Sequence, residues 1–485
     1  MGNPVVGVGL RGPPRRSRDV CDWTNWVSTQ WRPVGGVTPS SPDVVVVGGG
    51  FAGLSAGALL AERGARVTVL DARAQLGGRA TAFVDRHTGE LVDNGQHVLF
   101  GCYRATLDFL RRIGALDNVR IQPSMEVPYL DKQGRRSVLR CPPLPSPLHL
   151  LAAVLDWDPM PWRDRLASLQ LAAPLRRARA ELRQSGRVSA IPPGTVSEWL
   201  IAHGQRPKLR AWLWDPLAVA ALNQSPDLAD AAPFVRVLAE MFGPDPTAAS
   251  LVLPVKPLHQ MYAEPARDFI RAREGDVRVN ALARVVVEHG RVRGVEVRGE
   301  RIDAPRVVLA VPWFALRTVF GPSPPPELSP LITLATAMES MPIVTVNLWY
   351  DRHVMDELFV GLPGREMQWM FDKRLAFGGD ASHLSLVSSG ATRLASLGSD
   401  ELTSLAALEV EQALPAARDA RLVRATVVRE KQATFSLAPG QPVRPGTATP
   451  VQGLYLAGDW IDTGLPGTIE SAVVSGHLAA ELVHG

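Results

Sequence analysis

The chain has 485 residues, of which 46% are hydrophobic and 21% charged, with a formal net charge of +4 at pH 7. This composition is typical of a globular protein large enough for two domains, and the mild charge without a basic stripe argues against a nucleic-acid partner. The three cysteines and ten histidines show no metal-ligand spacing, so we expect neither disulfides nor a metal site.

Residues 1–42 carry Arg, Pro, Gly and Ser without apolar periodicity, and we expect them to form a disordered extension. The pair Arg15-Arg16 is not followed by an apolar stretch, so we expect no secretion signal. No run of about 18 apolar residues occurs in the sequence, which predicts no membrane-spanning segment. Together these features predict a cytoplasmic protein.

The stretch DVVVVGGGFAGLSAGALLAERGARVTVLDA predicts a strand, a glycine turn, an Ala- and Leu-rich helix and a second strand. The turn reads Gly48-x-Gly50-x-x-Gly53, and Asp71 follows the second strand. In this pattern the glycines allow a tight turn, the approach of a pyrophosphate and close helix packing, and the acid accepts hydrogen bonds from a ribose. Free N–H groups at the helix N-terminus favour the anion. We therefore expect a Rossmann-like α/β domain that binds a dinucleotide.

A second glycine pair, Gly77-Gly78, is followed by Arg79 in the segment LGGRA. A loop of this kind suits a large cofactor whose phosphates pair with an arginine. The segment resembles the corresponding loop of the flavin-containing amine oxidoreductase superfamily, and this resemblance implies that the cofactor is FAD.

The segment PPLPSPLHLLAAVLDWDPMPWRDRLASLQLAAPLRRARAELRQ predicts helices with apolar faces. It contains Trp157 and Trp162 and ends in a basic cluster. Such a segment could lie in a membrane interface with its arginines toward anionic headgroups. A core helix with a solvated basic end explains the pattern equally well, and both interpretations stay open.

The segment DVRVNALARVVVEHGRVRGVEVRGERIDAPRVVLAVP alternates apolar and polar residues. It predicts consecutive antiparallel strands with a turn at His289-Gly290. In the superfamily that the chain resembles, the backbone of a strand in this region meets the adenine, and Val285 best matches that position. The strand over 307–312 would then lead out of the cofactor domain.

The chain ends in LYLAGDWIDTGLPGTIESAVVSGHLAAEL, which predicts a strand, a Gly-Asp pair, a loop and a final helix. By the same resemblance, Gly458 and Asp459 hold the ribityl chain of FAD. The turn Gly467-Thr468-Ile469 then faces the pyrimidine end of the flavin, where negative charge develops on reduction. The two ends of the chain would thus hold one cofactor.

These elements predict a discontinuous FAD-binding domain over 43–125, 256–320 and 447–485. The intervening pieces, 126–255 and 321–446, should build a substrate domain of mixed β-sheet and helices. The predicted fold class is therefore α/β, with a Rossmann-like domain and a second, substrate-binding domain.

Two blocks, LVDNGQHVLFGCYRATLDFLRRIG and AGDWIDTGLPGTIESAVVSG, resemble the hydroxysqualene dehydroxylases of bacterial hopanoid synthesis. The resemblance covers most of the chain from about Asp43 onward. It implies reduction of an allylic C30 isoprenoid alcohol to squalene by reduced FAD, which an electron donor not identified by the sequence must regenerate. Because a C30 hydrocarbon is nearly insoluble in water, we expect a peripheral enzyme at the inner face of the cytoplasmic membrane.

Loss of hydroxide from an allylic alcohol requires a proton donor near the flavin. His97 in DNGQH and Asp462 in DWIDTG are the candidates, because both motifs should border the cofactor. His97 could instead hydrogen-bond to backbone, and Asp462 could cap the final loop. Gly95 and Gln96 are expected to touch the flavin through their backbone.

Three alternatives remain at this point. An amine oxidase of the superfamily usually carries an aromatic residue where this chain has Thr468, and often a lysine near the flavin, whereas no lysine occurs between Lys256 and Lys373. A carotenoid desaturase, which also holds a long polyene precursor beside FAD, stays open. A non-catalytic isoprenoid-binding escort protein shares the fold but lacks a working flavin site.

Overall fold

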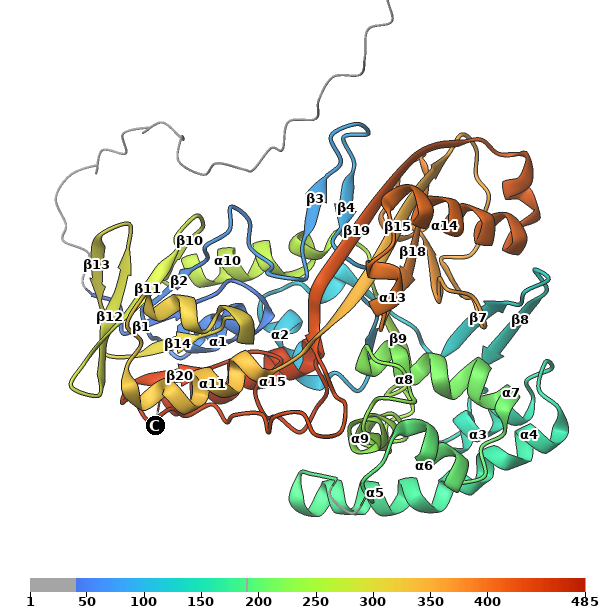
Figure 1. The fold of residues 1–485 in the computed structure, drawn as a ribbon, viewed down its shortest axis with the longest axis horizontal. Helices are drawn as coiled ribbons and strands as arrows, with labels where there is room; N and C mark the ends of the chain where they lie inside the picture. Colours follow the sequence, from blue (N-terminus) through green and yellow to red (C-terminus); the bar gives the residue numbers. More distant parts are fainter. Residues whose placement is uncertain (1–40, 189–190, 485) are drawn as a thin grey trace, which may run out of the picture. The chain divides into compact units, whose positions relative to one another are not determined.

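The computed structural model describes residues 41–188 and 191–484 of the chain, shown as a coloured ribbon in Figure 1. Apart from Ser41 and Pro42, the expected extension over 1–42 lies outside the described residues. Residues from Ser41 onward belong to one compact unit, which contains all of the sheets and helices below.

A five-stranded parallel sheet brings together strands from the start, the middle and the end of the chain. In spatial order its strands are β10 (Asp276–Arg278), β2 (Val67–Leu70), β1 (Val44–Val47), β14 (Val307–Leu309) and β20 (Leu454–Leu456). All four valines of β1 are buried, because both faces of the sheet are covered. The carboxyl ends of these strands therefore meet at one edge, where the glycine turn and the Gly-Asp pair both begin.

Helices cover one face of this sheet (Figure 1). They are α1 (Phe51–Glu62), α2 (Arg104–Arg112), α10 (Glu264–Arg271) and α15 (Ile469–His484). A Cβ on Gly476 of α15 would lie only 2.3 Å from the carbonyl oxygen of Ala52 in α1. The final helix can approach α1 this closely because it has a glycine at the contact.

The other face of the parallel sheet packs on a three-stranded antiparallel sheet and on α11 (Ser329–Ala337). The strands are β11 (Ala283–Glu288), β12 (Arg291–Val297) and β13 (Glu300–Asp303). Glu288 pairs with Arg291 across His289-Gly290, and both turn residues have positive φ, 51° and 69°. The predicted hairpin and its turn are confirmed.

A seven-stranded mixed sheet lies in the order β19-β15-β18-β17-β16-β7-β8. Its strands are β7 (Glu126–Leu130), β8 (Arg136–Arg140), β15 (Ser340–Tyr350), β16 (Phe359–Gly361), β17 (Trp369–Asp372), β18 (Ser382–Ser388) and β19 (Leu422–Phe435). Three helices accompany it: α12 (Lys373–Phe377), α13 (Thr392–Ala395) and α14 (Ser399–Ala413). The long strands β15 and β19 run from this sheet toward the parallel sheet (Figure 1).

A helical cluster, drawn in green tones in Figure 1, packs around buried aromatic residues that include Trp157, Trp199 and Phe234. Its helices are α3 (Leu148–Leu155), α4 (Trp162–Ala167), α5 (Ala172–Ser185), α6 (Val196–Ala202), α7 (Pro207–Leu209), α8 (Asp215–Leu222) and α9 (Ala231–Met241). Among the helices of the described residues, none has the length and apolar character needed to cross a bilayer.

Two small sheets carry the segment that follows the first βαβ unit. β3 (Ala82–Val84) and β4 (Leu91–Asp93) form a hairpin, and β5 (Leu99–Phe100) and β6 (Val119–Ile121) both pair with β9 (Leu251–Pro254). The residues 94–98 between β4 and β5 form a turn that is fixed at both ends by these sheets.

Candidate functional site

Segments from the early and the late parts of the described chain border one cavity of about 440 Å³. Its wall combines the turn after β1, the loop after β2, the turn after β4, the end of β19 and the start of α15. The expected site residues in this wall are Gly48, Gly50, Asp71, Gly77, Gly78, Arg79, Gly95, Gln96, His97, Gly458, Asp459, Gly467, Thr468 and Ile469. The carboxyl edge of the parallel sheet is therefore the floor of the candidate site.

The turn after β1 has the geometry that a pyrophosphate site requires. Gly48 has a φ of 115°, and a Cβ on it would lie 2.2 Å from the Ala310 carbonyl oxygen, so only glycine fits there. A Cβ on Gly53 would lie 1.9 Å from the Gly48 carbonyl oxygen, which makes Gly53 a packing residue outside the cavity wall. A Cβ on Gly50 would come no closer than 3.8 Å to any of its neighbours. Gly50 thus leaves room for a ligand at the N-terminus of α1.

The carboxylate of Asp71 is held in place at the end of β2. Its Oδ2 accepts a hydrogen bond of 2.7 Å from the Gly49 N–H, and its Oδ1 accepts one of 2.7 Å from the Arg73 N–H. Each carboxylate oxygen can accept further hydrogen bonds. Asp71 therefore joins the glycine turn to the strand and keeps acceptor capacity toward the cavity that it lines.

A charge pair connects the loop after β2 to the segment that follows β20. Arg79 Nη2 lies 2.5 Å from Asp459 Oδ1, and Arg79 Nη1 donates a hydrogen bond of 2.6 Å to the Ala433 carbonyl oxygen. The guanidinium of Arg79 also lies over the ring of Trp313, 5.5 Å from its centroid. The loop after β2 is thus bonded to the segment after β20 and to the end of β19 at the cavity.

The start of α15 forms another part of the wall. Helical N–H groups at an N-terminus point outward and favour negative charge beside them. Glu470 is turned away from that position, because its carboxylate accepts hydrogen bonds of 2.9, 2.9 and 2.6 Å from Ala105 N–H, Thr106 N–H and the Thr106 hydroxyl. Burial raises the pKa of Glu470. The electropositive end of α15 therefore remains available to a ligand in the cavity.

His97 lies in the turn after β4 and lines the cavity. Its Nδ1 is 3.1 Å from the Gly95 carbonyl oxygen, which can only accept a hydrogen bond. Nδ1 therefore carries a hydrogen, and in the neutral ring Nε2 is an acceptor. Burial lowers the pKa of His97, and nearby Lys373 and Arg79 act in the same direction. His97 can give up a proton from Nε2 only in its imidazolium form.

Besides Gly53, two expected residues lie outside the cavity wall. Asp462 accepts a hydrogen bond of 2.9 Å from Arg187 and lies 3.7 Å from Arg444, and its Oδ1 also accepts one of 3.2 Å from the Gly464 N–H. These contacts match the capping alternative for this residue. Val285 is buried in the core of the three-stranded sheet, and the wall nearby is formed by residues 281–283 instead.

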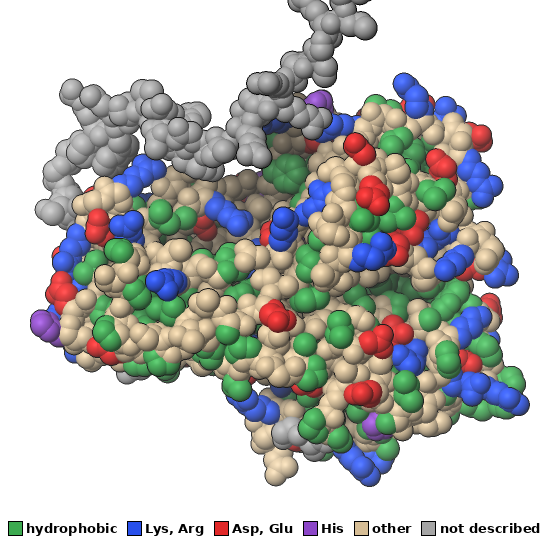
Figure 2. Space-filling model, in the orientation of Figure 1, with side chains coloured by type: hydrophobic (Ala, Val, Ile, Leu, Met, Phe, Trp, Pro, Cys, Tyr) green, Lys and Arg blue, Asp and Glu red, His purple; other side chains and the backbone are tan. Residues whose placement is uncertain are grey.

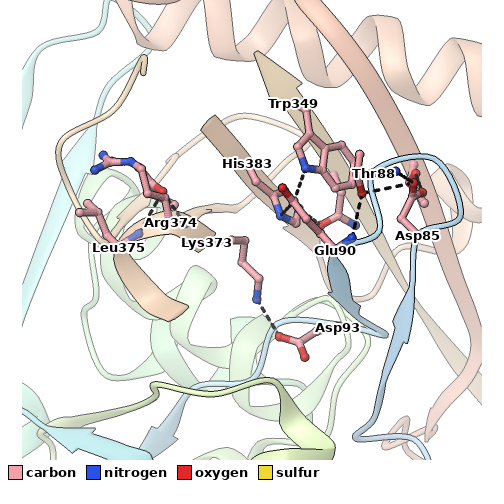
Figure 3. Close-up of polar contacts among 12 residues, drawn as sticks. Asp85, Thr88, Glu90, Asp93, Trp349, Lys373, Arg374, Leu375 and His383 are labelled. Atoms are coloured by element: carbon pink, nitrogen blue, oxygen red, sulfur yellow. Dashed lines mark hydrogen bonds and ion pairs between the residues drawn. The ribbon is translucent and has the colours of Figure 1, made fainter. Parts of the chain in front are cut away.

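Two charged residues at the turn after β4 were missed by the sequence analysis. Lys373 of α12 donates a hydrogen bond to Asp93 (Figure 3) and another to Gln96. Glu430 of β19 lines the cavity and accepts a hydrogen bond of 3.1 Å from Asn94 Nδ2. No local pattern marks either residue, because the partners lie hundreds of positions away in the sequence. In the sequence, Lys373 is marked only as the residue that ends the lysine-free stretch.

Comparisons with known proteins give consistent results. The family profile described as flavin containing amine oxidoreductase matches residues 51–484. Hydroxysqualene dehydroxylase of Rhodopseudomonas palustris is 30% identical over 91% of this chain and 98% of its own. A zeta-carotene desaturase of Arabidopsis thaliana is 26% identical over 91% of this chain and 85% of its own. A crystal structure of an oxidoreductase from Methanosarcina mazei superimposes with a TM-score of 0.69, at 16% identity and covering 90% of this chain and 99% of that one.

Proposed function

Because the chain belongs to the flavin-containing amine oxidoreductase family, a family of FAD-dependent enzymes, we propose that it reduces hydroxysqualene to squalene. The expected α/β fold class, the oxidoreductase class and FAD as cofactor are confirmed by this membership. The observation that supports the finer proposal is the likeness to hydroxysqualene dehydroxylases, at 30% identity over 91% of this chain in the relative reported above.

The residues of the cavity fit FAD. We assign the pyrophosphate to the open side of Gly50 and the N-terminus of α1, and the adenosine ribose to Asp71. Arg79 and Asp459, paired at 2.5 Å, would border the ribityl and phosphate region, and the start of α15 would face the flavin ring. A dinucleotide with a large redox-active ring requires two such groups. The N-terminus of α1 provides an anion site for the pyrophosphate, and the N-terminus of α15 provides an electropositive edge for the ring.

The reaction breaks the allylic C–O bond and places a hydride on the carbon, with the hydroxyl leaving as water. Reduced FAD supplies the hydride when it is bound. We assign the proton transfer to His97 through Nε2, the ring nitrogen that the Gly95 contact leaves free. Part of the cavity wall is apolar and suits a hydrocarbon chain: Val98, Leu99, Ala220, Ala221, Ile343 and Val387.

The test is an anaerobic mixture of photoreduced protein with hydroxysqualene, phytoene or an amine, followed by flavin absorbance. We expect only hydroxysqualene to reoxidise the flavin. Because His97 must carry a second proton to act as an acid, reoxidation should become faster as the pH falls through the lowered His97 pKa. Reduction of the oxidised enzyme by phytoene would contradict the proposal.

A second candidate function is desaturation of a carotenoid precursor, because zeta-carotene desaturases are also similar to this chain. The neutral form of His97, with Nε2 as an acceptor, suits removal of a proton from such a substrate. In that case the rate would rise with pH, opposite in sign to the dehydroxylation. Amine oxidation and a non-catalytic binding role have no comparable support.

We also propose that the enzyme takes its substrate from the inner face of the cytoplasmic membrane through the helical cluster. Trp157 is buried, whereas Trp162 is 65% exposed and Leu148 of α3 is 55% exposed. Exposed arginines lie on α4 and on the following helix α5: Arg163 on α4, and Arg176, Arg177 and Arg183 on α5. Figure 2 shows hydrophobic and basic side chains mixed on this part of the surface. This combination suits contact with anionic lipids.

Vesicle flotation tests this proposal. The double variant Trp162→Ser, Leu166→Ser removes two exposed apolar side chains of α4, and we expect the vesicle-bound fraction to fall about tenfold. Leu408→Ser on α14, also exposed, is the matched control and should bind as the native protein does. Equal binding of all three proteins to vesicles with anionic lipid would contradict a role of the helical cluster.

A further inference from the structure

The ammonium group of Lys373 is buried against the turn that lines the cavity. The side chains of Lys373 and Asp93 are both 3% exposed, and Lys373 Nζ lies 2.7 Å from Asp93 Oδ2. Figure 3 shows Lys373 reaching from the start of α12 to Asp93 at the end of β4. Asp93 Oδ1 accepts a further hydrogen bond of 3.0 Å from the Leu258 N–H. Both charges are therefore compensated, as a buried ion pair requires.

The ammonium group has two further contacts. It donates a hydrogen bond of 2.5 Å to Gln96 Oε1, and it lies 4.1 Å from the centroid of the Phe377 ring. Burial lowers the pKa of Lys373, and the Asp93 carboxylate opposes that effect. With a carboxylate, an amide oxygen and an aromatic ring around it, Nζ has a partner for each of its three hydrogens.

The contact with Lys373 determines the orientation of the Gln96 amide. An ammonium group can only donate, so the atom that faces it must be the amide oxygen. The amide nitrogen Nε2 consequently points elsewhere, and within 41–188 and 191–484 it donates to no protein group. Gln96 lines the cavity, and so do its neighbours Gly95 and His97. A ligand in the cavity can supply the acceptor that this donor lacks among the described residues.

We propose that Lys373 is a positioning residue for the cofactor: it orients Gln96 so that Gln96 Nε2 donates a hydrogen bond to an acceptor atom of the flavin ring. Lys373 does not line the cavity, so it acts through Gln96. The inference depends on the binding of FAD and not on the identity of the substrate. It remains testable if the enzyme acts on another isoprenoid.

A double-mutant cycle on the full chain tests the inference. Gln96→Ala removes the donor, and the pair Asp93→Asn, Lys373→Met removes the positioning group without leaving a buried charge unpaired. Each change should raise the Kd for FAD about two- to tenfold, the value of one hydrogen bond, and shift the absorption band of bound oxidised flavin. The triple variant should match Gln96→Ala, because Lys373 has no further route to the flavin.

The pair Asp372→Asn, Arg374→Met is the matched control, because it removes the neighbouring ion pair, 3.0 Å apart at the start of the same short helix, with both charges together. It should keep the native Kd and flavin spectrum. If the pair variant does not fold, the pair Asp93→Asn, Lys373→Leu, which also removes both charges and the donor to Gln96, replaces it in the cycle and should give the same non-additive pattern. Native FAD binding and spectrum in the variants of Gln96 or Lys373, or effects that simply add in the triple variant, would overturn the proposal.

Discussion

Replacing Gly48 with alanine should unfold the cofactor site and abolish FAD binding. The new Cβ would lie 2.2 Å from the Ala310 carbonyl oxygen, a backbone atom that cannot move aside, and the φ of 115° strains any residue other than glycine. Strain and overpacking together should lower the free energy of unfolding by about 2–5 kcal/mol. Urea unfolding followed by circular dichroism, with a parallel titration of FAD, measures both effects.

Gly50→Ala provides the contrast. A Cβ at this position meets no neighbour closer than 3.8 Å, so the unfolding midpoint should stay near that of the native protein. The same Cβ occupies space that we assign to the pyrophosphate, so the Kd for FAD should still rise. If Gly50→Ala bound FAD normally, or if Gly48→Ala were as stable as the native chain, the assignment of this turn would be wrong.

Replacing Lys373 alone with methionine should be the most destabilising change outside the glycine turn. It leaves the Asp93 carboxylate, 3% exposed, without its counter-ion, and breaking a buried ion pair in this way costs about 3–5 kcal/mol. Urea unfolding of the protein with and without FAD measures the loss. The loss should appear in both states, because the unpaired charge does not depend on the ligand.

The double variant Asp93→Asn, Lys373→Met should recover most of that stability, because it removes both charges together. It would still lack the group that orients Gln96. A single variant as stable as the native protein would show that the pair is not buried as described, and a double variant as unstable as the single one would show that packing, not charge, is responsible.

The sequence predicted those parts of the fold whose signals are local. The all-valine strand β1, the glycine turn and the hairpin at His289-Gly290 each follow from a few adjacent residues. The early and late segments were expected to meet because of a family resemblance, and β14 produces that arrangement by pairing in parallel with β1 on one side and with β20 on the other. The order of the seven-stranded sheet could not be predicted, since its pairings join segments that are distant in sequence.

The candidate site, like the fold, could be predicted from the sequence only where the signals are local. Residues of the glycine-containing turns could be placed at a cavity from spacing and resemblance, and the structure puts most of them in its wall. Asp462 could not be placed, because its partner Arg187 is 275 positions earlier in the chain. Lys373 could not be identified for the same reason, since Asp93 lies 280 positions away. Charge pairs between distant segments leave no periodic pattern in a sequence.

The measurement that tests the central claim most directly is an anaerobic single turnover with photoreduced enzyme and hydroxysqualene. Squalene is extracted and quantified by mass spectrometry against the amount of flavin reoxidised. We expect one squalene for each flavin, because one hydride reduces one allylic carbon. Flavin that stays reduced while the alcohol is recovered unchanged would contradict the account.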